Sequence, residues 1–222
     1  GDDDDSSDDD DSAAAGTTWA SPSEAWLTIT GGGIGGVVAA LGDIDDDGAP
    51  DIALGAPDDL WLDPAGDTGF GAVYVFLGET IAAPGTIDLG AADAVIRGDG
   101  AGDGIGNNVG SAGDVDGDGR PDLLISGGGT ENTYLFFAST LNGGGELRAA
   151  EADVVVTGLV SEYARGIGDF DGDGHDDVLL SNTLVSPNGN VSGRTFLLSG
   201  ATVAAGGSVD VDSAWTTSPG EG

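Results

Sequence analysis

The chain has 222 residues and a formal net charge of −35, from 40 acidic side chains against five arginines and no lysine. Such a surface repels nucleic-acid phosphates and anionic membranes, so neither is expected as a partner. The absence of cysteine excludes disulfides and thiolate metal sites, and no apolar stretch approaches the ~20 residues of a membrane-spanning helix.

Residues 1–24 form an acidic and small-residue tail. Eight of the first eleven residues are aspartate, so this tract cannot bury apolar surface and repels itself. We expect a solvated spacer, with a tract that binds calcium or docks on a partner as the alternative. The absence of methionine predicts that Gly1 is a processed end from which an export signal has been removed. Residues 217–222 are expected to form a second tail.

A series of short strand candidates occupies residues 25–216, the predicted repeat domain. Residues 25–30 are rich in β-branched and aromatic side chains and are followed by three glycines. Turn-forming clusters separate the later candidates, and the 43 glycines argue against long helices, so the chain is expected to be all-β. Three units of four strands are predicted at 36–41, 51–54, 72–77 and 93–97, at 108–113, 122–125, 133–137 and 153–157, and at 165–168, 177–180, 194–198 and 208–211.

One nine-residue pattern occurs three times, always between the first and second strand of a unit. Aspartate occupies positions 1, 3, 5 and 9, and glycine occupies position 6. Hard cations such as Ca²⁺ take six to eight oxygen ligands, and carboxylates on alternate residues before a sharp turn can wrap such an ion. The residue at position 7 can add its backbone carbonyl. The predicted ligands are Asp43, Asp45, Asp47, Ala49 and Asp51; Asp114, Asp116, Asp118, Arg120 and Asp122; and Asp169, Asp171, Asp173, His175 and Asp177.

Other interpretations of these loops fit less well. Four carboxylates in one turn repel each other without a cation, which argues against solvated Asp-Gly turns. An EF-hand needs a glutamate at position 12, where this chain has Leu54, Ile125 and Leu180 inside predicted strands. Mg²⁺ demands a stricter octahedral geometry. We therefore expect about three Ca²⁺ sites. Loops of modest affinity fill where calcium is about millimolar, so an extracellular or cell-surface location is expected.

Four short strands per unit are typical of a propeller blade. The three loops, each followed by an apolar strand, together with the runs at 55–57 (Gly-Ala-Pro) and 70–74 (Phe-Gly-Ala-Val-Tyr), resemble the FG-GAP repeats of the integrin α-subunit propeller. The resemblance covers residues 31–212, with repeats at about 31–98, 99–160 and 161–216, and departs at 126–128 and 181–183, where Gly-Ala-Pro is replaced. It implies a propeller-like array of three four-stranded blades and a backbone carbonyl ligand at position 7, with the His175 ring turned to solvent.

The function expected from these features is not catalytic. Without cysteine or lysine, and with one histidine, the usual nucleophile–base pairs are missing, and the obvious carboxylate pairs belong to the calcium loops. Trp61 lies in an insertion of the first unit and is a candidate contact residue, with packing as the alternative.

The number of blades points to assembly. Three blades cannot close a ring, since closed propellers have about four to eight, and residues 25–30 stand where the last strand of a missing preceding blade would lie. We expect head-to-tail association with other copies by addition of this strand, or else a monomer with capped ends. This predicts a calcium-stabilised, self-assembling subunit of a surface filament or layer. The alternative, implied by the resemblance, is a monomeric adhesion module that binds a protein or glycan.

Overall fold

The computed structural model describes residues 25–34, 36–59, 71–100, 104–126, 132–158, 163–182 and 194–211. The acidic tract, Trp61 and residues 217–222 lie outside these residues. The described chain is almost entirely β-structure, as predicted, and each of its α-helices is a single turn. None of the helices in this part of the chain is long and apolar enough to cross a membrane.

The first two repeats each form a sheet of four antiparallel strands, which we call a blade. The first blade contains β2 (Val37–Gly42), β3 (Asp51–Ala56), β4 (Ala72–Phe76) and β6 (Ala94–Arg97). The second contains β7 (Asn108–Gly113), β8 (Asp122–Ser126), β9 (Thr133–Phe136) and β11 (Val154–Thr157). The two middle strands of each blade are apolar at most positions because both of their faces are covered.

The third blade has three strands within the described residues. They are β12 (Tyr163–Gly168), β13 (Asp177–Asn182) and β14 (Arg194–Leu198). The sequence predicted a fourth strand of this blade at 208–211, and that assignment is wrong. The segment forms β15 (Gly207–Asp210), which joins the second blade in parallel with β11. Two four-stranded blades and one three-stranded blade are therefore described.

A short excursion follows the third strand of every blade. It consists of a helical turn and a short strand: α1 (Gly78–Ile81) and β5 (Gly85–Asp88), α2 (Ala138–Leu141) and β10 (Gly145–Arg148), and α3 (Gly200–Val203) and β15. Single 3₁₀ turns, Leu89–Ala91 and Ala149–Glu151, lead on to β6 and β11. β10 pairs in parallel with β6 of the preceding blade, as β15 does with β11. Neither β5 nor β10 was predicted from the sequence.

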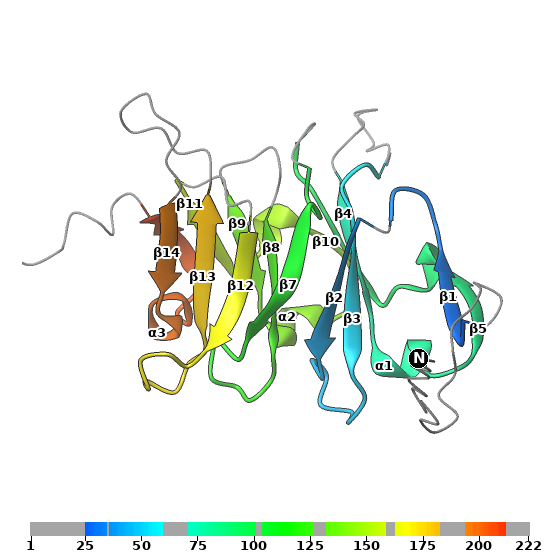
Figure 1. The fold of residues 1–222 in the computed structure, drawn as a ribbon, viewed down its shortest axis with the longest axis horizontal. Helices are drawn as coiled ribbons and strands as arrows, with labels where there is room; N and C mark the ends of the chain where they lie inside the picture. The colour runs from blue at the N-terminus through cyan, green and yellow to red at the C-terminus, as the bar shows by residue number, and fades with distance from the viewer. Residues whose placement is uncertain are drawn as a thin grey trace, which may run out of the picture.

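β1 (Leu27–Thr30) follows the same rule. It pairs in parallel with β5, so it takes the position of the outer strand of a preceding blade (Figure 1). This is the position that the sequence predicted for residues 25–30. In the described chain, β1 and β5 form a separate sheet of two strands.

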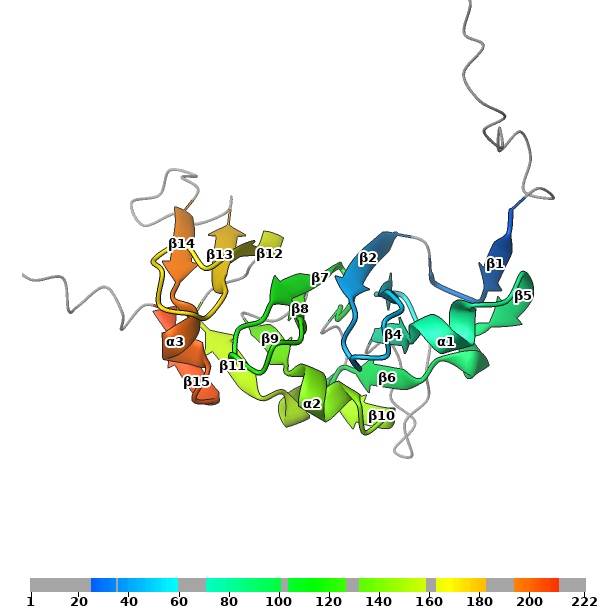
Figure 2. The same cartoon turned by 90° about the horizontal axis from the view of Figure 1, so that it is seen from below.

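The blades stack face to face in an open row, with β2, β7 and β12 as neighbours (Figure 2). One core lies between the first and second blades and contains Ile44 and Phe136. A second core, between the second and third blades, contains Leu124 and Leu180. A third cluster, around Phe76, covers the outer face of the first blade beneath the segment of β1 and β5. No closed ring is formed by the described residues.

Close approach between neighbouring blades requires glycine at two positions. A Cβ atom added to Gly55 would lie 2.1 Å from the carbonyl oxygen of Gly106, and one added to Gly166 would lie 2.1 Å from that of Ala112. Both contacts are with backbone, which cannot rotate out of the way. These glycines therefore set the spacing of the blades and of the loops at their ends.

Candidate metal centre

The three aspartate loops lie along one edge of the row, each joining the first and second strands of its blade (Figure 1). This is the placement predicted from the sequence. Each loop begins after a bulge in the strand pair, and its position-6 glycine adopts a left-handed conformation. The φ angles of these glycines are 89° at Gly48, 91° at Gly119 and 94° at Gly174. A side chain with a Cβ would be strained there, so glycine makes the turn possible.

The carboxylate at position 1 is held by the backbone of its own loop. In the first loop, Asp43 Oδ1 accepts a hydrogen bond of 3.0 Å from Asp47 N, and Asp43 Oδ2 accepts one of 2.9 Å from Gly48 N. The position-1 aspartates of the other loops, Asp114 and Asp169, accept the same bond from the position-6 glycine. The turn therefore fixes the direction of the first carboxylate.

The carboxylate at position 9 connects three parts of the blade. Asp51 Oδ2 accepts a hydrogen bond of 2.7 Å from Ile44 N in the loop, and Asp51 Oδ1 accepts one of 2.6 Å from Gly78 N at the start of α1. Asp122 and Asp177 make the equivalent pairs of bonds to their own loops and to α2 and α3. All three position-9 side chains are buried, with at most 1% of their surface exposed.

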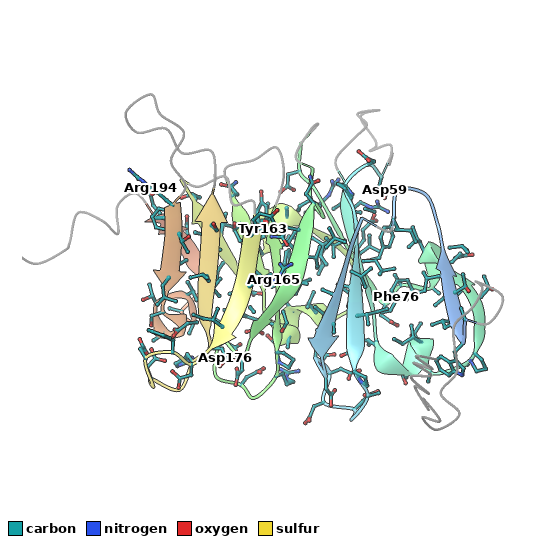
Figure 3. All side chains as sticks on the ribbon, viewed as in Figure 1. Asp59, Phe76, Tyr163, Arg165, Asp176 and Arg194 are labelled. Atoms are coloured by element: carbon teal, nitrogen blue, oxygen red, sulfur yellow. The ribbon has the colours of Figure 1, made fainter. Side chains whose placement is uncertain are left out.

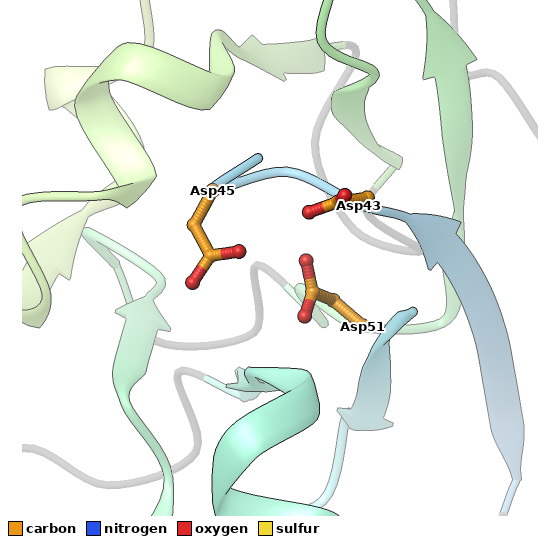
Figure 4. Close-up of side chains that lie close together, drawn as sticks. All are labelled: Asp43, Asp45 and Asp51. Carbon is orange, nitrogen blue, oxygen red and sulfur yellow. The ribbon is translucent and has the colours of Figure 1, made fainter. Parts of the chain in front are cut away.

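Three carboxylates converge in each loop. Oxygen atoms from positions 1, 3 and 9 lie within 4.8 Å of one another, and Figure 4 shows the first of these groups. The groups are Asp43, Asp45 and Asp51; Asp114, Asp116 and Asp122; and Asp169, Asp171 and Asp177. These are nine of the twelve aspartates singled out in the sequence as ligands.

The predicted ligands at positions 5 and 7 do not belong to these groups. Each position-5 carboxylate instead accepts a hydrogen bond from the backbone N–H of position 7, at distances of 2.7 Å to Ala49 N, 2.9 Å to Arg120 N and 2.9 Å to His175 N. The position-5 side chains that accept these bonds are Asp47, Asp118 and Asp173. Their coordination of an ion, and that of the position-7 carbonyls, stays a prediction.

The electrostatics of the loops favour a bound cation. Burial raises the pKa of Asp122 to about 7, although the N–H groups of Ala138 and Val115 act to lower it. Burial also raises the pKa of Asp51. For the half-buried Asp116, burial and then the neighbouring carboxylates raise the pKa. The folded loops thus hold negative charge that their own hydrogen bonds do not fully stabilise, and a nearby cation would supply the missing stabilisation.

The donor set suits a hard cation. Each group consists of carboxylate oxygens alone, with no histidine or cysteine donor, which is the preference of Ca²⁺ and Mg²⁺ rather than of zinc or copper. In the second loop the Arg120 guanidinium is bound to Asp118, which lies outside the group of three. In spite of burial, this contact holds the pKa of Asp118 below its usual value.

The second and third loops are joined by contacts that the sequence analysis missed. Asp176 Oδ2 accepts a hydrogen bond of 2.9 Å from Asp114 N, and Asp176 N donates one of 2.8 Å to Asp114 O. Asp176 immediately precedes β13, and Figure 3 shows it on the edge that carries the loops. The available signal was position 8, which is proline in the first two loops and aspartate in the third.

The His175 ring contacts the second loop and is not turned to solvent as expected. The family resemblance implied a ring turned to solvent, but His175 Nδ1 lies 2.8 Å from the carbonyl oxygen of Val115 in the second loop. The ring also packs against Gly117, where an added Cβ would lie 2.9 Å from His175 Cε1. The reason is that the third loop lies directly beside the second, so its position-7 side chain meets a neighbour.

Comparison with known proteins agrees with the sequence resemblance. Residues 35–76, which span the first aspartate loop and β2 to β4, match the model of the FG-GAP repeat. The chain is also similar to integrin alpha-5 of Xenopus laevis, with 33% identity over 122 residues. That match covers 51% of this chain and 11% of the integrin, so the chain corresponds to about a tenth of that relative. The predicted resemblance to FG-GAP, integrin-like repeats is confirmed.

Proposed function

We propose that this chain, which carries an FG-GAP repeat in its first blade, is a non-enzymatic calcium-binding module that acts by binding protein outside the cell or at its surface. The convergence of three carboxylates in each of three loops is the observation that supports this proposal. About three Ca²⁺ ions would be held by positions 1, 3 and 9 of each loop, with positions 5 and 7 completing the coordination.

Calcium at these positions would have a structural role. Each position-9 carboxylate already links its loop to the first residue of the following helical turn. An ion on the same carboxylate would hold the first strand, the second strand and this turn together. Ions that bind only the folded chain contribute about 1.4 kcal/mol each at tenfold saturation, or about 4 kcal/mol for three sites. That is a large share of a typical stability of about 5–15 kcal/mol.

Two forms of protein binding fit the chain. The first is a self-assembling structural subunit of a filament or layer, which is supported by apolar side chains exposed on the end of the row, among them Leu179 and Leu197. The second is an adhesion module with a protein ligand, which is supported by the similarity to integrin alpha-5. We favour the first, because the exposed end is a property of this chain's own structure.

The calcium proposal is tested by thermal unfolding in about 10 mM calcium, which exceeds the roughly 0.1–1 mM dissociation constants of extracellular modules, and in excess chelator. Calcium should raise the melting temperature. Asp45→Asn removes one carboxylate from the group of three in the first loop. It should reduce the calcium-dependent rise in melting temperature by about a third, since it weakens one site of three. The matched control is Asp46→Asn, which removes the same charge from the same loop at a residue outside the group of three. A melting temperature that does not change between calcium and chelator would overturn the proposal.

A further inference from the structure

The outer face of the third blade, which points away from the second blade, exposes large apolar side chains. Ile167 on β12, Leu179 on β13 and Leu197 on β14 are 41%, 36% and 46% exposed, and Phe170 in the third loop is 72% exposed. Their neighbours Val178, Leu180, Phe196 and Leu198 point the other way and are buried against the second blade. We call the four exposed residues the end face.

The end face repeats the positions that form the cores between the other blades. Leu179 and Leu197 are cross-strand partners, as are Ala53 and Val75 in the first blade and Leu124 and Leu135 in the second. The equivalents of the four end-face residues are all at most 2% exposed, because the next blade covers them: Leu41, Ile44, Ala53 and Val75, and Ala112, Val115, Leu124 and Leu135. The end face is therefore built like an inter-blade contact that has no following blade among the described residues.

The first blade shows the complementary surface. Val38 on β2 is 63% exposed, whereas its equivalents Val109 and Ala164 are 1% and 2% exposed because each packs on the preceding blade. On the same outer side of the first blade, β1 occupies the position of the outer strand of a preceding blade. The third blade, in turn, has no strand beside the outer edge of β14 among the described residues. Within the described ranges, one end of the row carries an additional outer strand and the other end shows none.

We propose that the third blade of one copy stacks on the first blade of a second copy, and that β1 of the second copy becomes the fourth strand of the third blade. This inference rests on the proposed function and identifies the partner as another copy of this chain. β1 would lie antiparallel to β14, as β6 lies beside β4 and β11 beside β9. A contact between two different surfaces continues head to tail and produces a ring or a filament.

The repeats also fix the register of the added strand. Ala94 pairs with Val75 in the first blade, and Val154 pairs with Leu135 in the second. Leu27 is the equivalent of Ala94 and Val154, since all three pair in parallel with the glycine that begins the following short strand. Leu27 of one copy should therefore lie opposite Leu197 of the next, and Ile29 opposite Thr195.

Charge opposes this contact and makes it dependent on conditions. Two chains of net charge −35 repel each other, and three Ca²⁺ ions would neutralise six charges of each. Assembly is therefore expected in calcium at moderate ionic strength and should be weakened by chelation.

The register is tested by cross-linking, because the chain contains no cysteine. A chain with Leu27→Cys is mixed with a chain with Leu197→Cys in calcium under mild oxidation. Opposed Cβ atoms at about 3.5–4.5 Å form a disulfide, so a covalent pair of the two variants should appear. The shifted combination of Leu27→Cys with Thr195→Cys should give several-fold less product. Equal yields from both mixtures, or no product from either, would overturn the inference.

The end face is tested by light scattering over a range of protein concentrations in calcium. Leu179→Glu places a charge on the contact and should weaken association roughly tenfold or more, because a buried unpaired charge is strongly unfavourable. Asn142→Glu adds the same charge on the exposed rim of the second blade and should leave association unchanged. A monomer in all conditions, with the end face covered by another segment or another protein, would overturn the inference. The calcium-dependent rise in melting temperature would still be present, so failure of this inference is distinct from failure of the calcium proposal.

Discussion

Removal of the Asp176 carboxylate should loosen the junction between the second and third blades. This side chain accepts a hydrogen bond from Asp114 N, and the Asp176 backbone donates one to Asp114 O. In Asp176→Ala the backbone bond remains, but the Asp114 N–H loses its acceptor in a half-buried site. Asp114 is the first aspartate of the second loop, so the lost bond also held the backbone of a predicted ligand.

The expected cost follows from this one unsatisfied donor. A buried N–H without a partner costs about 1–3 kcal/mol, and the half-burial of this junction places the cost in the lower part of that range. Loss of one negative charge from a strongly anionic chain offsets a few tenths of a kcal/mol at most. We expect a net loss of about 1–2 kcal/mol, or about 2–8 °C in melting temperature for a chain of this length. Asp176→Asn keeps an oxygen acceptor and should lose less.

Differential scanning calorimetry in calcium and in chelator measures this loss. The hydrogen bond does not pass through an ion, so the loss should appear in both conditions. Asp58→Ala removes an exposed carboxylate and corrects for the change in net charge. If Asp176→Ala melts at the same temperature as Asp58→Ala, the hydrogen bond contributes nothing and the reasoning is refuted.

Two further predictions concern the packing between strands and blades. Gly166→Ala forces a Cβ against a backbone carbonyl of the second blade and should reduce the free energy of unfolding by about 1–3 kcal/mol, measured by urea unfolding; Gly36→Ala, where space is open, should change it little. Burial, and then the hydrogen bond to a carboxylate, raise the pKa of Tyr74 to about 12 from 10.0. Because the unfolded chain ionises first, stability is full below pH 10 and falls as the pH rises, by about 1.4 kcal/mol at pH 11. Tyr74→Phe should flatten this decline in alkaline urea titrations, and a slope equal to that of the unmodified chain would contradict the assignment.

The strands and the aspartate loops could be predicted because their signals are local. Residues 108–113 and 194–198 were predicted as strands and coincide with β7 and β14. A buried strand has its own apolar pattern, and a left-handed glycine after alternating aspartates specifies a turn without help from the rest of the chain. The convergence of positions 1, 3 and 9 also follows from one loop and the strand that continues it.

The parallel strands β5 and β10, and the parallel pairing of β15, could not be predicted in this way. β5, β10 and β15 are four residues long and mostly exposed, so they carry no clear alternation of apolar and polar side chains. Each becomes a strand because the edge of the preceding blade offers backbone partners, and that edge comes from a distant part of the sequence. The assignment of 208–211 to the third blade was wrong for this reason. The residues of a short strand do not determine which sheet edge it pairs with.

Contacts between loops have the same origin. An aspartate at position 8 is compatible with many turns, and Asp176 acquires a function only when the third loop lies beside the second. Likewise, the contact between the His175 ring and the Val115 carbonyl could not be predicted from the place of His175 in its own loop. The structure within each repeat is therefore encoded locally and can be predicted, whereas the contacts between one repeat and the next cannot.

The consequence is largest for the third blade. The second blade is covered on both faces, and the first is covered by the second blade and by the segment of β1 and β5. Among the described residues, the third blade packs against the second blade alone. In an array whose repeats touch only their neighbours, stability is the sum of each repeat and its interfaces, so the third blade should open most easily. The hydrogen bonds of Asp176 lie at the junction between the described second and third blades, and a second copy stacked on Leu179 and Leu197 would supply another junction. Assembly and the stability of the third blade should therefore rise together.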